Sequence, residues 1–171
     1  KRSGRISATC CNSGDQAFEL LKTEKFDVII SDYDMPEMNG IRLLVRLRSE
    51  GIHTPFILFT GRGREEVVIE ALNNGASHYL RKGGDPRSLY AELVNVIIQV
   101  VEKSRYEEQV HERELLISSI FQHLPDPTYA TDLSGKIITW NRAMEEISGI
   151  RFSGDGTVYQ YTDIMPLYRD Y

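Results

Sequence analysis

Short apolar runs alternate with amphipathic stretches along the first hundred residues of the chain. The apolar runs are typical of buried strands, and the stretches between them have the spacing of helices with one apolar face. Strands are predicted at Ile6–Cys10, Val28–Ile30, Pro55–Thr60 and Ser77–Leu80. Helices are predicted at Gln16–Thr23, Ile41–Ser49, Glu65–Asn73 and from Pro86 onward. This alternation favours an α/β fold with a doubly wound parallel sheet.

The stretch that begins at Pro86 contains no further glycine or proline as far as Leu124. Apolar residues occupy heptad positions at both of its ends, and charged residues fill the middle. This pattern predicts one long connecting helix of the coiled-coil type. The alternative is two separate helices joined by a charged segment around Glu102–Glu114.

Two prolines directly after Leu124 end this stretch. The runs Thr128–Asp132 and Lys136–Asn141 then flank a three-residue loop with a glycine, which predicts a β-hairpin. A short helix is predicted at Arg142–Ile147, where Gly149 stops it. The end of the chain therefore has strand and helix signals in a different order from its beginning.

Composition adds few constraints to this picture. Hydrophobic residues make up 41% of the chain and charged residues 26%, and the formal net charge is −5. These values are ordinary for a soluble globular protein. No basic stripe indicates nucleic-acid binding, no apolar run approaches the length of a membrane span, and no secretory signal is recognisable. Cys10 and Cys11 are neighbours on a predicted strand and point to opposite faces, which favours reduced thiols in a cytoplasmic protein.

Three polar residues stand at or just after the carboxyl ends of successive predicted strands, namely Asp32, Thr60 and Lys82. In an open parallel sheet these strand ends border the crevice where ligands bind. A carboxylate, a hydroxyl and an ammonium group together suit the handling of a phosphoryl group. Taken alone, Asp32 could equally be a turn or helix-capping aspartate.

The motif Ser31–Gly40, with Pro36 four residues after Asp32, resembles the phosphoacceptor loop of response regulator receiver domains. The spacing from Thr60 to Tyr79 and Lys82 resembles the rest of the same family's site. This resemblance covers about Ile6 to Ile98. It implies a flavodoxin-like fold that works in two-component signalling.

The resemblance implies a role for each of these residues. Asp32 would accept a phosphoryl group from a histidine kinase or phosphotransfer protein, and Thr60 and Lys82 would hold the phosphate oxygens. Thr60 and Tyr79 would form the conformational switch. Asp32 and the backbone carbonyl of Asp34 would bind Mg²⁺.

The chain departs from the family at its beginning. Receivers start with a strand that ends in an acidic pair for Mg²⁺, followed by a helix, and neither is recognisable before Ile6. We therefore expect residues 1–103 to be a receiver domain without its first strand and helix, with weak or no Mg²⁺ binding. We also expect this part to fold poorly or to associate, because the absent strand would lie at the centre of the sheet.

The stretch from Leu124 to about Ile150 resembles the opening of a PAS domain, in which a hairpin leads to a short helix through a Trp-Asn pair, here Trp140–Asn141. We accordingly expect a helical linker at 104–124 and the N-terminal part of a PAS domain at 125–171, a partial α+β fold. No PAS cofactor can be argued from the sequence. The order of parts resembles prokaryotic receiver–PAS proteins and hybrid histidine kinases.

The leading hypothesis is a cytoplasmic phosphorelay protein that passes the state of Asp32 through the helix to the PAS domain. The linker helix is expected to form a homodimer, and neither nucleic acid nor a membrane is an expected partner. Two alternatives stay open. One is a degenerate receiver that acts only in protein interaction, and the other is a phosphatase-like enzyme with Asp32 as nucleophile, which alone predicts turnover of small phosphate esters.

Overall fold

The computed structural model describes residues 6–61 and 65–152. The chain divides into two compact units, Lys1–Tyr106 and Glu107–Tyr171, termed here unit 1 and unit 2. Unit 1 holds the α/β elements, and unit 2 holds the hairpin and the last helix. Helix α4 (Pro86–Gln122) begins in unit 1 and ends in unit 2.

Unit 1 is built on a parallel three-stranded sheet in the order β1–β2–β3. Ser31 lies opposite Leu58 in the first pair, and Thr60 lies opposite Arg81 in the second. The carboxyl ends of the three strands therefore meet at one edge of the sheet. The strands are β1 (Ile29–Ser31), β2 (Phe56–Thr60) and β3 (His78–Arg81).

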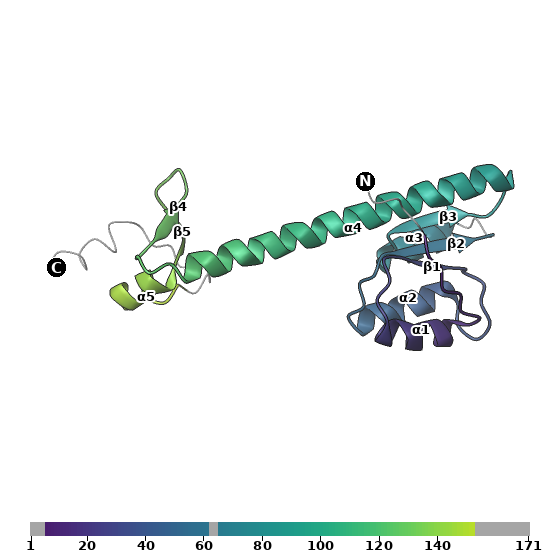
Figure 1. Cartoon of the computed structure of the whole chain (residues 1–171), viewed down its shortest axis with the longest axis horizontal. Helices are drawn as coiled ribbons and strands as arrows, with labels where there is room; N and C mark the ends of the chain where they lie inside the picture. Colours follow the sequence, from purple (N-terminus) through teal and green to yellow (C-terminus); the bar gives the residue numbers. More distant parts are fainter. Residues whose placement is uncertain (1–5, 62–64, 153–171) are drawn as a thin grey trace. The chain divides into compact units, whose positions relative to one another are not determined.

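Helices α1 and α2 lie on one face of the sheet, and the first part of α4 lies on the other (Figure 1). The main core fills the space beneath α1 and α2, where Leu44, Leu47 and Phe56 are fully buried. Side chains alternate along a strand, so Ile57 and Phe59 face the opposite side, toward α4. The other helices of unit 1 are α1 (Gly14–Thr23), α2 (Gly40–Ser49) and α3 (Glu65–Asn73).

The predicted strand Ile6–Cys10 is wrong. This segment belongs to no regular element and is exposed throughout. In the flavodoxin-like strand order 2-1-3-4-5, a second strand pairs only with the first, and no strand among the described residues takes that central place. Without a partner, an extended segment has no ladder for its backbone N–H and C=O groups, which stay in water. Cys10 and Cys11 are free thiols.

The long helix is a single element, since α4 comprises 37 residues without interruption. The alternative of two helices with a charged break is therefore wrong. Within unit 1, Val96 is buried, and Leu93 and Val100, one turn to either side of it, are half-buried. No helix among residues 6–61 and 65–152 is long and apolar enough to cross a membrane.

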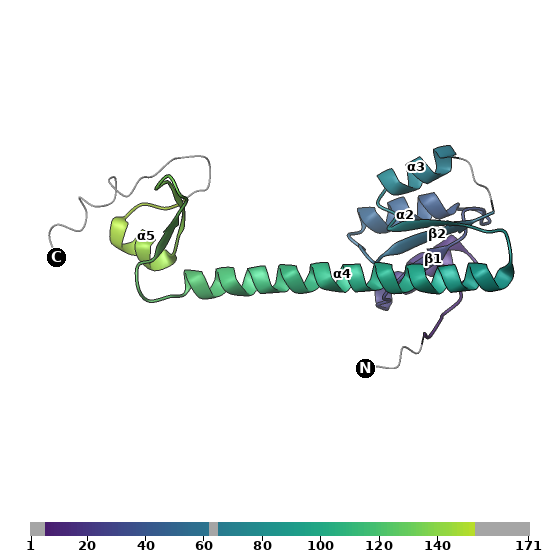
Figure 2. The ribbon, with the colours of Figure 1, turned by 90° about the horizontal axis from the view of Figure 1, so that it is seen from above.

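Unit 2 contains the predicted hairpin, with β4 (Tyr129–Thr131) antiparallel to β5 (Ile137–Trp140), and then α5 (Arg142–Ser148), which lies beside the hairpin in Figure 2. Ile137, Trp140 and Met144 form its small core. The ring of Phe152 meets the indole of Trp140 edge-on, with 5.4 Å between centroids. Gly149 ends α5 with a left-handed φ of 68°, as its position after the helix predicted.

Candidate functional site

Asp32 directly follows β1, at the edge where the three strands end. The buried Ser31 donates its hydroxyl to the Asp32 carbonyl at 2.9 Å, which fixes the backbone at this point. The backbone N–H of Asp34 donates to Asp32 Oδ1 over a long 3.4 Å. The Asp32 side chain remains 35% exposed, so a reactant can approach the carboxylate from solvent.

Lys82 directly follows β3 and reaches back to Asp32. Its backbone N–H donates to the carbonyl of Thr60 at 2.7 Å, which places the start of the side chain beside the end of β2. Its Nζ lies 2.5 Å from Asp32 Oδ2. Because both side chains are more than a third exposed, this ion pair adds little to stability and can exchange partners at small cost.

Thr60 and Tyr79 lie near this pair on the same sheet. Thr60 is the last residue of β2 and is fully buried. Tyr79 is partly buried against the main core and lies opposite Leu58 in the β2–β3 register. The structure thus joins Asp32 and Lys82 through side chains, places Thr60 next to Lys82 through the backbone, and puts Tyr79 farther down β3.

Gly40 is essential to the geometry around Asp32, and its role was not predicted from the sequence. A Cβ atom at this position would lie 2.3 Å from the Asp32 carbonyl oxygen and 2.8 Å from Leu58 Cδ1. Only glycine lets the first turn of α2 approach the Asp32 backbone this closely. The sequence presented Gly40 only as a chain break before a helix, because the atoms it touches are eight and eighteen residues away.

A second residue that sequence reasoning missed is Phe59. Lys82 Nζ lies 5.3 Å from the centroid of its ring, within the range of a cation–π interaction. Phe59 precedes Thr60 in an apolar strand, so its sequence context indicated only packing. The pairing with Lys82 depends on the alignment of β2 with β3.

Asp32 and Asp34 would supply part of the oxygen ligand set of a Mg²⁺ ion. No group of three acidic, histidine or cysteine residues that could hold a metal occurs among the described residues. One oxygen of Asp32 is already occupied by Lys82. Mg²⁺ requires a near-octahedral set of oxygen ligands, and two neighbouring aspartates supply only part of it.

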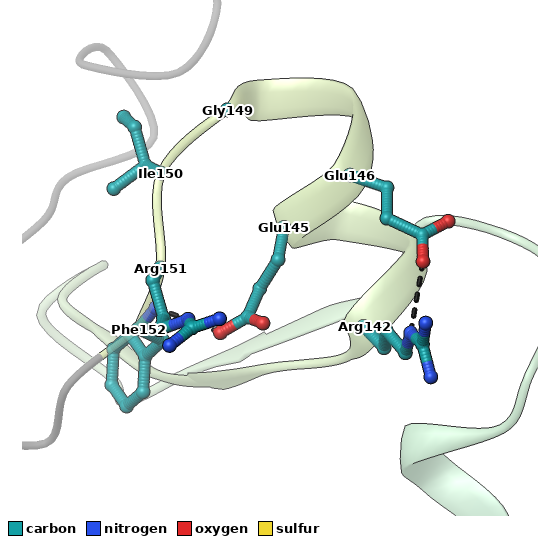
Figure 3. Close-up of a pocket in the computed structure, with 7 residues that line it drawn as sticks. All are labelled: Arg142, Glu145, Glu146, Gly149, Ile150, Arg151 and Phe152. Atoms are coloured by element: carbon teal, nitrogen blue, oxygen red, sulfur yellow. Dashed lines mark hydrogen bonds and ion pairs between the residues drawn. The ribbon is translucent and has the colours of Figure 1, made fainter.

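Unit 2 has a hollow of its own beside α5 (Figure 3). Three of its charged side chains are already engaged, since Arg142 Nε lies 2.9 Å from Glu146 Oε1 and Glu145 Oε1 accepts the Phe152 N–H at 2.9 Å. This arrangement resembles no catalytic cluster. The lining residues are Arg142, Glu145, Glu146, Gly149, Ile150, Arg151 and Phe152.

Comparison with known families agrees with these two units. The family model described as "Response regulator receiver domain" matches residues 2–94 of the 171, and the chain belongs to this family. The model described as "PAS fold" matches residues 115–153. The chain thus contains a receiver domain, a signalling module of two-component systems that typically lacks enzymatic turnover, followed by a PAS fold.

Two curated regulators are similar to a part of the chain. The chain is 36% identical over 110 residues to the rice two-component response regulator ORR21, covering 63% of this chain and 15% of that protein. It is 39% identical over 90 residues to the Escherichia coli regulatory protein AtoC, covering 53% and 18%. The chain thus spans less than a fifth of the length of these two relatives.

Among solved structures, the signal receiver domain of a putative Luxo repressor protein from Vibrio parahaemolyticus superimposes with a TM-score of 0.50. The two sequences are 22% identical, and the match covers 58% of this chain and 74% of the chain of that structure. This likeness shows the receiver fold. The likeness assigns no role to any single residue.

Proposed function

We propose that Asp32 is the phosphoacceptor of this receiver and takes a phosphoryl group from a histidine kinase or phosphotransfer protein. The observation that carries this proposal is the contact of Asp32 with Lys82 at the common edge of the strands. The carboxylate is accessible, and its counter-ion is a point charge that can follow the negative charge onto a phosphoryl group.

The chemistry of the transfer follows from the two oxygens of Asp32. Lys82 occupies Oδ2, whereas Oδ1 accepts only the long bond from Asp34 N–H among the described residues, so Oδ1 is the attacking oxygen in our proposal. It forms a bond to phosphorus as the phosphorus–nitrogen bond of phosphohistidine breaks. The electron pair of that bond leaves with the imidazole. Lys82 and the hydroxyl of Thr60 then hold the phosphoryl oxygens of the resulting acyl phosphate.

The signal leaves the site, in this proposal, through Thr60 and Tyr79 and then through α4 to the PAS fold. We propose the boundaries 1–103 for the receiver, 104–124 for the helical linker and 125–171 for the part of a PAS domain. The compact units divide after Tyr106, and the two family matches leave residues 95–114 between them, which supports a linker in this region. Phosphorelay from a histidine kinase also places the protein in the cytoplasm.

We further propose that α4 forms a homodimer through its C-terminal half. Ile117 is 68% exposed and shares one position of the heptad pattern with Val110. Light scattering on the full-length protein should show a dimer, and Val110→Asp with Ile117→Asp should yield a monomer. A parent protein that stays monomeric at high concentration would contradict the proposed homodimer.

The decisive experiment is labelling of the full-length protein with a small-molecule phosphodonor and Mg²⁺, read by intact mass. Asp32→Asn should abolish the added phosphoryl group, and label that survives on Asp34 or elsewhere would overturn the assignment. Lys82→Ala should weaken the response to phosphorylation far more than Arg81→Ala, its exposed neighbour. A protein that takes no label is a degenerate interaction module, and one that turns over phosphate esters is phosphatase-like.

A further inference from the structure

Phe59 lies on the opposite face of the sheet from the switch residues that the family resemblance names. Phe56, Leu58 and Tyr79 belong to the core beneath α1 and α2, and Thr60 has the same parity along β2 as Leu58. Side chains alternate along a strand, so Phe59 points to the face that α4 covers (Figure 1). It is half-buried there, and Leu80, its β3 partner, is buried.

Lys82 connects this aromatic ring to the candidate site. The base of the side chain is fixed by the backbone bond to Thr60, and its ammonium contacts Asp32 Oδ2 at 2.5 Å. The same ammonium lies 5.3 Å from the Phe59 ring centroid. The ring therefore supplies a second attraction that restricts a long, flexible and otherwise solvent-exposed side chain.

We propose that Phe59 is a positioning residue that holds the Lys82 ammonium at Asp32 and connects it to the α4 face of the sheet. The role of this contact in transfer rests on the proposed phosphorylation of Asp32. When a phosphoryl group is added, the negative charge around Lys82 increases, and the ammonium moves from the ring toward the phosphoryl oxygens. Phe59 then loses its cation and repacks beneath α4. This gives the site an output on the face opposite Thr60 and Tyr79.

The first test concerns the contact itself and needs no phosphorylation. A proton above an aromatic ring is shielded, so the ε-methylene protons of Lys82 should resonate upfield of those of exposed lysines such as Lys136. The signal is assigned by its loss in Lys82→Arg. Phe59→Tyr should keep the upfield shift, and Phe59→Leu, which preserves apolar volume without a ring, should remove it. A shift absent from the parent or retained in Phe59→Leu overturns the proposal.

The second test measures the rate of Asp32 labelling in the full-length protein. A cation–π contact at an exposed site is worth about 0.5–1 kcal/mol, so Phe59→Leu should slow labelling about two- to fivefold. Phe59→Tyr should restore the parental rate, and Ile57→Leu, a matched change on the same face of β2, should leave it unchanged. Equal slowing by Phe59→Tyr and Phe59→Leu, or no slowing by either, would overturn the positioning role.

Two further outcomes are separable. If Phe59→Leu fails to fold, Phe59→Met offers a second ringless side chain of similar volume for both measurements. If the parent protein takes no label at all, the proposed phosphoacceptor role fails. The contact between Phe59 and Lys82 is then decided by the methylene shifts alone.

Discussion

Helices α2 in unit 1 and α5 in unit 2 begin in the same way and are held in different ways. Each follows an asparagine whose side-chain oxygen accepts a hydrogen bond from the backbone N–H three residues later. Arg42 N–H donates to Asn39 at 2.8 Å, and Met144 N–H donates to Asn141 at 3.1 Å. Asn39 is partly exposed, whereas Asn141 is fully buried. One local capping signal thus serves two environments.

In unit 2 the cap residue also joins three segments of chain. The Oδ1 atom of Asn141 accepts a second bond from Thr128 N–H at 2.8 Å. Its Nδ2 donates to the carbonyls of Leu124 and Asp126 at 3.1 and 2.9 Å. Asn141 therefore connects the end of the linker and the start of the hairpin to α5. With two acceptor and two donor positions filled, the amide has its full complement of hydrogen bonds.

In unit 1 the close contact is made by the residue after the cap. Gly40 lets α2 approach the Asp32 carbonyl, and Asn39 only satisfies the helix end. The polar side chains nearby, Asp32 and Lys82, are partly exposed and held mainly by each other. The charged side chains of the site in unit 1 can therefore exchange partners, whereas the hydrogen bonds of Asn141 in unit 2 hold its polar groups in place.

Substituting the two asparagines should give the largest difference between the units. Asn141→Ala removes four hydrogen bonds. The Met144 N–H and the Asp126 carbonyl each keep a second partner, whereas the Thr128 N–H and the Leu124 carbonyl lose the one described for them. Each buried group left unsatisfied costs about 1–3 kcal/mol, so a loss of about 2 kcal/mol or more is expected. Asn39→Ala should cost about 1 kcal/mol, the usual value of an N-cap.

Urea unfolding can follow the two units separately. Trp140 is the only tryptophan and is buried in unit 2, so its fluorescence reports that unit. Hydrogen exchange of β2 amides reports unit 1. Asn141→Ser, which keeps a capping oxygen but lacks the two amide N–H donors, should fall between the parent and Asn141→Ala. Similar losses for Asn39→Ala and Asn141→Ala would contradict the comparison.

Substituting the first residue of each helix should destabilise unit 1 more than unit 2, the reverse of the order for the two asparagines. Gly40→Ala forces a Cβ against the Asp32 carbonyl and Leu58, and overpacking of this kind costs about 1–3 kcal/mol. Arg142→Ala removes an exposed i,i+4 pair with Glu146 and should cost no more than about 0.5 kcal/mol.

The matched glycine control is Gly61→Ala. Among the residues that the structure describes, chain neighbours aside, no atom lies within 4 Å of a Cβ added at Gly61, which follows β2 in the same part of unit 1. It should therefore change the free energy of unfolding little. Because Gly40→Ala displaces the backbone of Asp32, it should also slow phosphodonor labelling. A Gly40→Ala protein as stable and as readily labelled as Gly61→Ala would show that α2 can shift without consequence.

These differences explain which features the sequence could predict. Strands β1, β2 and β3 and helix α3 follow from local periodicity, and Asp32, Thr60 and Lys82 stand at strand ends that any parallel arrangement brings together. The Asp32–Lys82 contact needed only the strand order. Such features depend on local pattern or on topology.

The missed features depend on tertiary contacts between distant residues. The four bonds of Asn141, the contact of Gly40 with Asp32 and the ring of Phe59 beside Lys82 are set by distances in the folded chain. The error at Ile6–Cys10 has the same origin. Its sequence suits a strand, but a strand forms only where another strand offers hydrogen bonds.

The smallest expected effect contrasts two aspartates, Asp32 at the site and Asp132 in the hairpin loop. Asp132 Oδ1 accepts bonds from Ser134 Oγ at 2.6 Å, Ser134 N–H at 2.9 Å and Lys136 N–H at 3.0 Å. The Ser134 hydroxyl, followed by the backbone bonds from Lys136 and Ser134 and the charge of Lys136, lowers the pKa of Asp132 below its usual range. Every one of these donors comes from the loop itself, whereas Asp32 is bound by Lys82 from another strand.

The sign of the pH effect follows from this lowered pKa. The folded state binds the Asp132 proton less readily than the unfolded state, so the carboxylate stabilises the hairpin fully above the unfolded pKa of about 3.9. This contribution is lost as the pH falls through the lower, folded pKa. Hydrogen exchange of the Lys136 amide should therefore gain protection between these two pKa values as the pH rises, after correction for intrinsic exchange. Asp132→Asn keeps an acceptor without a titrating charge and should abolish this pH dependence, and a Lys136 amide with the same pH dependence in both proteins would assign it to another group.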